Sequence, residues 1–284
     1  MGSGLSSPEL LDFFQKHSPV AVLTGAGCST ASGIPDYRDK NGDWKQRQPI
    51  QYRAFVDEES SRQRYWLRSM LGWPYFSNAT PNNVHADLVV LEQTGLINGV
   101  ITQNVDGLHR QVGQAGLIEL HGQLHNVRCL KCDQVFPRQS FQSTLEQVNR
   151  SLLDQIKDQT IAMAADGDAH YEPDNFTDAS IPECTNCGGI LKPDVVFFGE
   201  AVPAVRVEHS FELIDQAKAL LVLGSSLMVF SGFRFPRHAH RNNYPLAIIN
   251  QGVTRADDLA DIKIDQECGA VMAALREELT GKAA

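Results

Sequence analysis

The sequence lacks any long hydrophobic run. Its richest apolar stretch, Ala219–Leu223, stops at Gly224, whereas a membrane-spanning helix needs about 18 consecutive apolar residues. The N-terminus also lacks the basic segment and apolar core of a secretory signal, and no transit peptide is seen. We therefore expect no membrane association and a cytoplasmic location, in a bacterial type of cytosol rather than the mitochondrial matrix.

Positive charge is in short supply. The 284 residues include 25 Lys and Arg against 34 Asp and Glu, which gives a formal net charge of −9. A chain with this balance has no overall attraction to phosphate backbones, so we expect no direct nucleic-acid partner. The hydrophobic content of 42% and charged content of 21% are those of a globular protein. The length allows one large domain or two smaller ones.

Cysteine is also scarce, but its spacing is informative. Four of the six cysteines form two CxxC pairs, Cys129 with Cys132 and Cys184 with Cys187. Two such pairs can complete a tetrahedral thiolate site with no position open for water, so they predict one structural zinc ion; a redox-active CxxC is the alternative. The thiol of Cys28 could be reactive, although a small buried hydrophobe is the simpler interpretation.

Short apolar runs recur along the chain and predict buried strands. These runs are Val20–Leu23, Gly99–Thr102, Val195–Phe198, Ala219–Leu223, Leu246–Ile249 and Ile262–Ile264. Helical patterns lie between several of them, for example at 85–93, 206–217 and 270–279. The alternation predicts an α/β fold, a doubly wound parallel sheet covered by helices on both faces. Residues 40–80 and 127–190 break the alternation and predict a smaller module, with a helix over 141–156.

A glycine-rich loop follows the first predicted strand. Gly25 and Gly27 could let backbone N–H groups approach a pyrophosphate at the start of a helix, although a plain strand-to-helix turn is the alternative. Thr30 stands where the dinucleotide fingerprint has its third glycine, and no second strand ends in an acidic residue about 20 residues later. Both departures disfavour a hydride-transferring dehydrogenase. Residues 33–49 instead form a polar loop able to fold over a ligand.

Polar side chains follow two other predicted strands. The segment Gln103–Asp106 follows Gly99–Thr102. His121 lies at the end of a second short apolar run, in the sequence IELHG. In open α/β sheets, ligands bind beyond the carboxyl ends of the strands, which places these residues near the glycine loop. His121 could accept a proton there at neutral pH. The alternative is a structural histidine, as we expect for His85 and His109.

Taken together, GAGCSTASGIPDYR, TQNVDGLH, ELHG, the CxxC pairs, KPDVVFFGE, LGSSL and the late Asn250 resemble the motifs of the sirtuins, which are NAD-dependent protein-lysine deacylases. The resemblance extends from about Pro19 to Ala274. RQRYW, GWPYFS and TRADDLA look closest to the class II branch that includes a mitochondrial sirtuin. The resemblance implies a Rossmann-like NAD-binding domain made of 1–39, 81–126 and 191–284. It also implies a small domain made of a helical insertion, 40–80, and a zinc-binding module, 127–190.

The resemblance implies which residues bind NAD as a co-substrate. The pyrophosphate would lie at the glycine loop, the nicotinamide at the strand-end polar residues, and the adenosine at the loops after the later strands. The implied set is Gly25, Ala26, Gly27, Ser29, Thr30, Ile34, Asp36, Tyr37, Arg38, Gln103, Asn104, Val105, Asp106, Gly224, Ser225, Ser226, Asn250, Gln251, Gly252 and Cys268.

The resemblance also implies the chemistry. The acyl oxygen would attack the ribose C1′ and expel nicotinamide. His121, with Asn104 beside it, would then act as general base on a ribose hydroxyl, and the products would be free lysine and an acyl-ADP-ribose. Acyl-lysine proteins or peptides would add as a strand in the cleft. The implied substrate contacts are Tyr65, Arg68, Val196, Phe197, Gly199, Glu200 and Val229.

Two features leave alternatives open. Tyr65 and Arg68 match a Tyr-x-x-Arg motif that reads acidic acyl chains in some class II sirtuins, but they could also form a solvated helix face. Ser231 and Gly232 stand where most sirtuins continue with proline, so we expect an altered helix start there. Protein ADP-ribosyl transfer at the same NAD site is the second hypothesis, and a non-catalytic nucleotide-binding zinc module is the third. The oligomeric state, monomer included, stays open.

Overall fold

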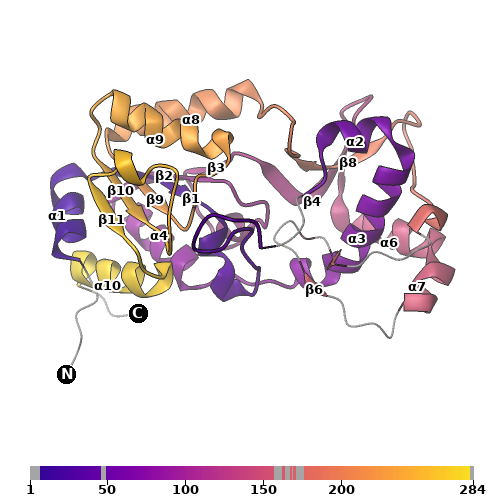
Figure 1. The fold of residues 1–284 in the computed structure, drawn as a ribbon, viewed down its shortest axis with the longest axis horizontal. Helices are drawn as coiled ribbons and strands as arrows, with labels where there is room; N and C mark the ends of the chain where they lie inside the picture. The colour runs from indigo at the N-terminus through magenta and orange to yellow at the C-terminus, as the bar shows by residue number, and fades with distance from the viewer. Residues whose placement is uncertain are drawn as a thin grey trace.

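The computed structural model describes residues 7–45, 49–156, 162–163, 167, 169–170 and 176–281. A large parallel sheet with its helices lies at one end of the molecule, and a smaller sheet with its own helices lies at the other (Figure 1). Within the part of the chain that is described, no helix is both long and apolar enough to cross a membrane.

The large sheet has six strands in the order β11-β10-β9-β1-β2-β3, and every neighbouring pair is parallel. This is the doubly wound order of dinucleotide-binding folds, in which the chain builds one half of the sheet and then returns to build the other. The strands are β1 (Val20–Thr24), β2 (Ile97–Thr102), β3 (Leu117–Glu119), β9 (Leu220–Leu223), β10 (Leu246–Ile249) and β11 (Ile262–Ile264).

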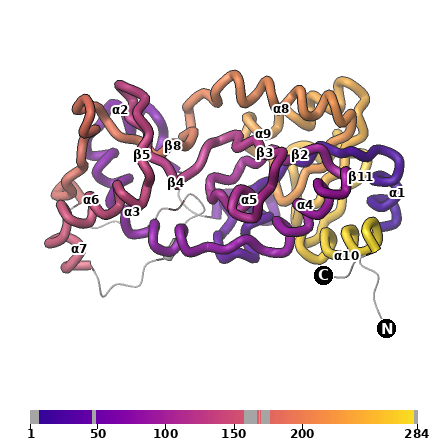
Figure 2. Tube along the Cα trace, turned by 180° about the vertical axis from the view of Figure 1, so that it is seen from behind, coloured from indigo at the N-terminus to yellow at the C-terminus, as the bar shows by residue number. Residues whose placement is uncertain are grey.

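Helices cover both faces of this sheet because its strands are apolar on both sides. Alternate residues of β1 enter different cores: Val20 and Val22 pack on one face, Ala21 and Leu23 on the other. The first face is covered by α1 (Pro8–His17), α4 (Asn83–Gln93) and α10 (Cys268–Thr280), and the second by α8 (Ala204–Ala217) and α9 (Phe230–Arg241). Figure 2 shows α8 on the opposite side from α4 and α10.

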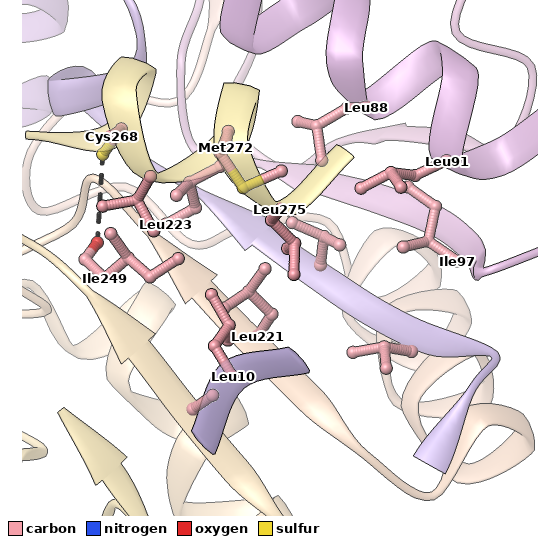
Figure 3. Packing of buried hydrophobic residues seen from close by; sticks show 14 of the residues in the cluster. Leu10, Leu88, Leu91, Ile97, Leu221, Leu223, Ile249, Cys268, Met272 and Leu275 are labelled. Carbon is pink, nitrogen blue, oxygen red and sulfur yellow. Dashed lines mark hydrogen bonds between the residues drawn. The ribbon is translucent and has the colours of Figure 1, made fainter. Parts of the chain in front are cut away.

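The first of these cores is made mainly of aliphatic side chains, with Phe13 and Phe14 of α1 among them. Figure 3 shows Leu10 of α1, Leu88 of α4 and Met272 of α10 converging on the β9 side chains Leu221 and Leu223. All five side chains are buried. At roughly 1.5–3 kcal/mol for each fully buried large apolar side chain, this face contributes much of the stability of the sheet that carries the strand ends.

The smaller sheet is antiparallel, in the order β5-β4-β8. Its strands are β4 (Gly122–Cys129), β5 (Val135–Pro137) and β8 (Leu191–Val195), and a two-stranded ribbon is formed by β6 (Ala162–Met163) and β7 (Ala169–His170). The other helices are α2 (Tyr52–Asp57), α3 (Glu59–Ser77), α5 (Leu108–Gln111), α6 (Arg138–Val148) and α7 (Arg150–Ile156), with short 3₁₀ turns η1 (Ala26–Cys28), η2 (Thr30–Ser32), η3 (Phe176–Asp178) and η4 (Asp257–Leu259).

Two sequence-based expectations about these elements are wrong. The run Val195–Phe198 is not a strand of the parallel sheet; β8 ends at Val195, pairs with β4, and is followed by an irregular segment. The helix expected over 141–156 is two helices that meet at Asn149, whose side-chain amide donates to the Leu145 carbonyl, 2.8 Å, and to that of Ser180, 2.8 Å. An amide that bonds locally in this way competes with a continuous helix.

Candidate active site

A cavity of about 550 Å³ lies beyond the carboxyl ends of the parallel strands. Its lining residues include those that directly follow β1, β2, β9 and β10, namely Gly25, Gln103, Gly224 and Asn250. The cavity therefore lies at the place where the strand order reverses, which is where doubly wound sheets bind their ligands. Its volume is within the range of small-molecule sites.

Three glycines bring the loops after β1 and β9 into backbone contact. A Cβ on Gly25 would lie 2.7 Å from the Ser225 Cβ, and one on Gly27 would lie 2.9 Å from the Cα of Gly224. Gly224 has φ +63°, and its own Cβ would lie 2.6 Å from the Cys28 nitrogen. The glycines are needed here because no side chain fits between the two loops.

The same contact corrects the expectation for the glycine loop. The Gly25 N–H donates to the Leu223 carbonyl, 3.0 Å, and the Gly27 N–H donates to the Gly224 carbonyl, 2.8 Å. The loop continues into the 3₁₀ turns η1 and η2 rather than into an α-helix. These two N–H groups are thus engaged within the protein, and no α-helix N-terminus directly follows the strand.

His121 lines the cavity two residues after β3, and both ring nitrogens have partners. Nδ1 lies 2.9 Å from the Gln103 carbonyl oxygen, and Nε2 lies 2.8 Å from the Ser231 hydroxyl. Burial lowers the pKa of His121 to about 4; the Gln103 bond opposes this shift, while the charges of Arg206 and Arg234 add to it. His121 is therefore neutral at pH 7 and able to accept a proton.

A buried polar network supports the strand-end segment. Asp106 accepts from the Ser29 hydroxyl, 2.6 Å, and from the Leu108 N–H, 2.9 Å, and burial raises the pKa of this carboxyl. The Asn104 side-chain amide donates to Ser29 Oγ and to the Gly25 carbonyl, both at 3.0 Å. This network fixes Asn104, which lines the cavity, against the glycine loop.

The loop after η2 covers one side of the cavity. The Arg38 guanidinium lies 4.0 Å from the Trp44 ring centroid and donates to the Gly42 carbonyl, 2.7 Å. The Trp44 ring in turn packs edge-on against Phe198, with centroids 5.6 Å apart. Lys40 approaches Gly252 so closely that a Cβ there would collide with it, and the Lys40 carbonyl accepts from Val253, 2.9 Å.

A buried ion pair shapes the segment after β8. Lys192 is nearly buried; its ammonium group lies 3.1 Å from Glu200 and also donates to the Val195 carbonyl. Glu200 accepts from the Phe197 N–H, 2.8 Å, and the Val196 N–H donates to the His121 carbonyl, 2.8 Å. The segment is thereby tied directly to His121.

Most residues implied by the sequence are brought to the cavity. Those that line it are Gly25, Ala26, Gly27, Asp36, Tyr37, Arg38, Gln103, Asn104, Val105, His121, Val196, Phe197, Gly199, Glu200, Gly224, Ser225, Ser226, Val229, Asn250 and Gln251. The described lining does not include Ser29, Thr30, Ile34, Tyr65, Arg68, Asp106, Gly252 and Cys268. Sequence reasoning missed Trp44, Phe198, Phe230 and Arg234, and it noted Ser231 only as a departure from the family pattern.

Tyr65 and Arg68 share one face of α3, as their spacing predicts, but neither is among the residues that line the cavity. Tyr65 is 4% exposed and packs edge-on against Phe197, with centroids 5.1 Å apart. The Arg68 Nε donates to the Ala169 carbonyl of β7, 2.9 Å. The interpretation of a solvated helix face is therefore wrong for Tyr65, which belongs to the core.

The four paired cysteines converge on one point. All four Sγ atoms lie within 4.8 Å of one another; Cys129 and Cys187 are 3.5 Å apart, and Cys132 and Cys184 are 3.8 Å apart. Four thiolates at about 2.3 Å from a tetrahedral zinc would be roughly 3.8 Å apart, so the donor set and the spacing fit one zinc ion. Four sulfur ligands fill its coordination sphere, which makes the site structural.

The two remaining cysteines are buried under the glycine loop. Cys28 is 1% exposed and donates to the Leu223 carbonyl, 3.2 Å; burial and the neighbouring Cys268 raise the pKa of its thiol well above the usual value. A thiol held protonated is a poor nucleophile. Cys28 is therefore a small buried hydrophobe, and Cys268 begins α10 beside it.

Comparison with known proteins agrees with this geometry. The Sir2 family profile matches residues 25–231. An NAD-dependent protein deacetylase of Xanthomonas campestris pv. campestris (strain 8004) is 49% identical over 272 residues, which is 96% of this chain and 92% of that protein. NAD-dependent protein deacetylase 2 of Bradyrhizobium diazoefficiens is 48% identical over 271 residues, which is 95% and 98% of the two chains.

A solved structure of Sir2 with a p53 peptide and NAD⁺ is similar over 96% of this chain and 98% of that chain, with a TM-score of 0.72 and 29% identity. The family match covers more than half of the chain and includes the glycine loop, the strand-end polar residues and His121. The chain belongs to the Sir2 family.

Proposed function

We propose that the chain is an NAD-dependent protein-lysine deacylase, which transfers the acyl group of lysine to ADP-ribose and releases nicotinamide. The observation that carries this proposal is the position of His121, whose imidazole lines the cavity at the end of the parallel sheet with Nδ1 held by the Gln103 carbonyl. Deacetylase relatives at 49% and 48% identity support the same activity.

NAD supplies the reaction with an electrophilic ribose carbon, from which nicotinamide leaves, and with the hydroxyl that receives the acyl group. The chain contributes a neutral base. The Gln103 carbonyl can only accept, so His121 carries its proton on Nδ1, and Nε2 is the nitrogen that can accept a further proton. Asn104, held by Ser29 and Gly25, keeps the neighbouring wall in place.

The remaining cofactor roles follow the position of each loop. We assign the pyrophosphate to the backbone around Ala26, the nicotinamide side to the segment after β2, and the adenosine side to the loops after β9 and β10. Ser29, Ile34 and Asp106 act from behind the wall, by holding its shape. Gly252 leaves room for Lys40 of the loop after η2, which covers the cavity. Cys268 is buried and contributes apolar packing below the site.

We infer that an acyl-lysine peptide enters between the segment after β8 and the start of α9. Val196 and Val229 line the cavity from these two segments, and Phe197, Gly199 and Glu200 continue the first wall. The peptide would add as an extended strand, a mode that reads backbone and leaves the sequence loosely specified. The acyl chain would then point toward His121.

The finer assignments are also proposals. RQRYW, GWPYFS and TRADDLA favour the class II branch. We assign 1–39, 81–126 and 191–284 to the NAD-binding domain, and 40–80 with 127–190 to the small domain; the shared pairing of β4 with β8 would join them. A cytoplasmic location is supported by the bacterial source of the relatives and by six cysteines that are not paired in disulfides in the described part of the chain.

The test is release of free nicotinamide from NAD with and without an acetyl-lysine peptide. Because the acyl oxygen is the nucleophile that expels nicotinamide, we expect release only when the acylated peptide is present, and none with the same peptide carrying free lysine. Nicotinamide release at the same rate with and without the acylated peptide, with ADP-ribose attached to a protein, would favour ADP-ribosyl transfer. Binding of NAD without any release would make the chain a nucleotide-binding module.

A further inference from the structure

Ser231, which stands where most sirtuins continue with proline, forms a hydrogen bond with the base nitrogen of His121. Ser231 Oγ lies 2.8 Å from Nε2, and both residues line the cavity. They are 110 positions apart in the chain, so only the fold brings them together. Ser231 is half-buried, in the first turn of α9.

The direction of this hydrogen bond follows from the other side of the ring. Nδ1 lies 2.9 Å from a carbonyl oxygen, which can only accept, so Nδ1 carries the hydrogen. In the neutral ring Nε2 then has a lone pair and no hydrogen. The Ser231 hydroxyl must donate to Nε2, which leaves the lone pairs of its own oxygen available to a third group.

The backbone next to Ser231 is adapted to this position. A side chain on Gly232 would collide with the amide of Gln103, the residue whose carbonyl holds Nδ1. The Gln103 amide also donates to Ser225 Oγ, 2.9 Å. Gly232 therefore lets α9 approach closely enough for Ser231 to reach the ring. Gln103 contacts both partners, His121 through its carbonyl and Gly232 through its side-chain amide.

We propose that Ser231 is a catalytic residue that relays a proton from the substrate to His121 during acyl transfer. With NAD bound, its ribose hydroxyl would give its proton to Ser231 Oγ as the ribose oxygen bonds to the acyl carbon. The π pair between that carbon and the lysine nitrogen would move onto the nitrogen, and the Ser231 proton would pass to His121 Nε2. The products of this step are an imidazolium and an unchanged serine, so protons and charge balance. The inference rests on the proposed function, because it assigns His121 as the base.

A structural explanation of Ser231 makes a different prediction. A serine in the first turn of a helix can simply stabilise that turn, and its loss would then lower stability or NAD binding and slow every step alike. A relay acts only after nicotinamide has left. The two explanations are separated by comparing acyl transfer with the earlier, reversible exchange of labelled nicotinamide into NAD.

The experiment measures both rates for the wild type, Ser231→Ala and Ser231→Thr with an acetyl-lysine peptide. We expect Ser231→Ala to lower the ratio of acyl transfer to exchange at least about tenfold, while Ser231→Thr, which keeps the hydroxyl, restores most of it. Equal slowing of both rates in Ser231→Ala, or no rescue by threonine in a folded protein, would overturn the relay.

A second measurement does not depend on turnover. The ¹⁵N resonances of the His121 imidazole at pH 7 should show hydrogen on Nδ1 only, and the Nε2 resonance should shift in Ser231→Ala because its hydrogen bond is lost. Hydrogen on Nε2 in the wild type would refute the proposal. If the wild type released no nicotinamide, the proposed function would fail, and this measurement would still decide the geometry on its own.

Discussion

At the scale of single residues, the sequence identifies His121 as the candidate base but not how its ring is held. His121 follows a short apolar run and matches the family motif ELHG. Its tautomer depends on the Gln103 carbonyl and on the Ser231 hydroxyl, which belong to distant elements. Local spacing carries no signal for either contact. His85 and His109, by contrast, are buried against each other with ring centroids 4.7 Å apart, as expected for structural histidines.

Replacing His121 by alanine should remove acyl transfer and leave the fold and NAD binding in place. General-base catalysis contributes about 10²–10⁴-fold, so a few per cent of wild-type turnover or more would contradict the role. His209→Ala is the matched control because His209 is an exposed histidine of α8 away from the cavity. Steady-state deacylation and NAD binding by calorimetry check both variants.

At the scale of elements, the structure gives the glycines of the first loop a packing role that the sequence does not predict. Gly25 and Gly27 are small because the loop after β9 packs against them. Gly224, the partner, is about 200 residues away in the sequence, so the contact is invisible to any local pattern. The predicted strands other than Val195–Phe198 were identified correctly because the strands of a parallel sheet are short and mainly apolar.

This loop contact predicts a specific cost for Gly224→Ala. The substitution combines a positive φ of +63° with a Cβ 2.6 Å from the Cys28 nitrogen. Gly113→Ala is the control, because Gly113 has φ +87° with nothing within 4 Å of its Cβ. We expect Gly113→Ala to lower the free energy of unfolding, measured with urea, by about 1 kcal/mol. Gly224→Ala should lower it by at least about 2 kcal/mol more. Equal losses would show that the two loops separate freely.

Helix α3 carries the proposal for acyl selectivity. Arg68→Met removes the guanidinium that donates to Ala169, and we expect it to reduce activity on succinyl- or glutaryl-lysine peptides more than on acetyl-lysine peptides. Arg64→Met is the control on the same helix, because Arg64 is exposed and stacks on Phe176. The measurement is kcat/KM on each peptide. Equal reductions on neutral and acidic acyl chains would assign Arg68 to holding β7 alone.

At the scale of the whole molecule, the cysteine pairs join parts of the chain that the sequence separates by 51 residues. We expect elemental analysis to find one zinc ion per chain, bound by Cys129, Cys132, Cys184 and Cys187. Metal binding of this kind contributes to folding, so chelation should lower Tm by more than about 10 °C, with recovery on adding zinc. Active protein without zinc, or a Tm that the chelator does not change, would contradict the assignment.

Because several histidines are buried, we expect the free energy of unfolding of the molecule to fall below about pH 6.5. Burial lowers the pKa to about 4 for His85, about 3 for His109 and about 4 for His121. The unfolded chain, with histidine pKa values near 6.5, binds more protons than the native state below that pH. Stability should therefore fall as pH drops from 6.5 toward 4, by up to about 1.4 kcal/mol per pH unit for each histidine.

Two buried carboxyls oppose part of this loss. Burial raises the pKa values of Asp87 and Asp106, so the native state takes up their protons first at the acid end of the range. The net slope is measured by urea unfolding at pH 7, 6 and 5, where the histidines dominate. A free energy of unfolding that stays constant or rises on acidification over this range would refute the neutral, buried state of these rings.

The proposed deacylation requires that one NAD is consumed for each acylated lysine that reacts. The most direct measurement is mass spectrometry of one reaction with limiting acetyl-lysine peptide, quantifying free nicotinamide, deacetylated peptide and acetyl-ADP-ribose. We expect equal amounts of all three from the wild type, and neither deacetylated peptide nor acetyl-ADP-ribose from His121→Ala. Deacetylated peptide formed together with free acetate while NAD remains intact would contradict it, because the acyl group would then have passed directly to water.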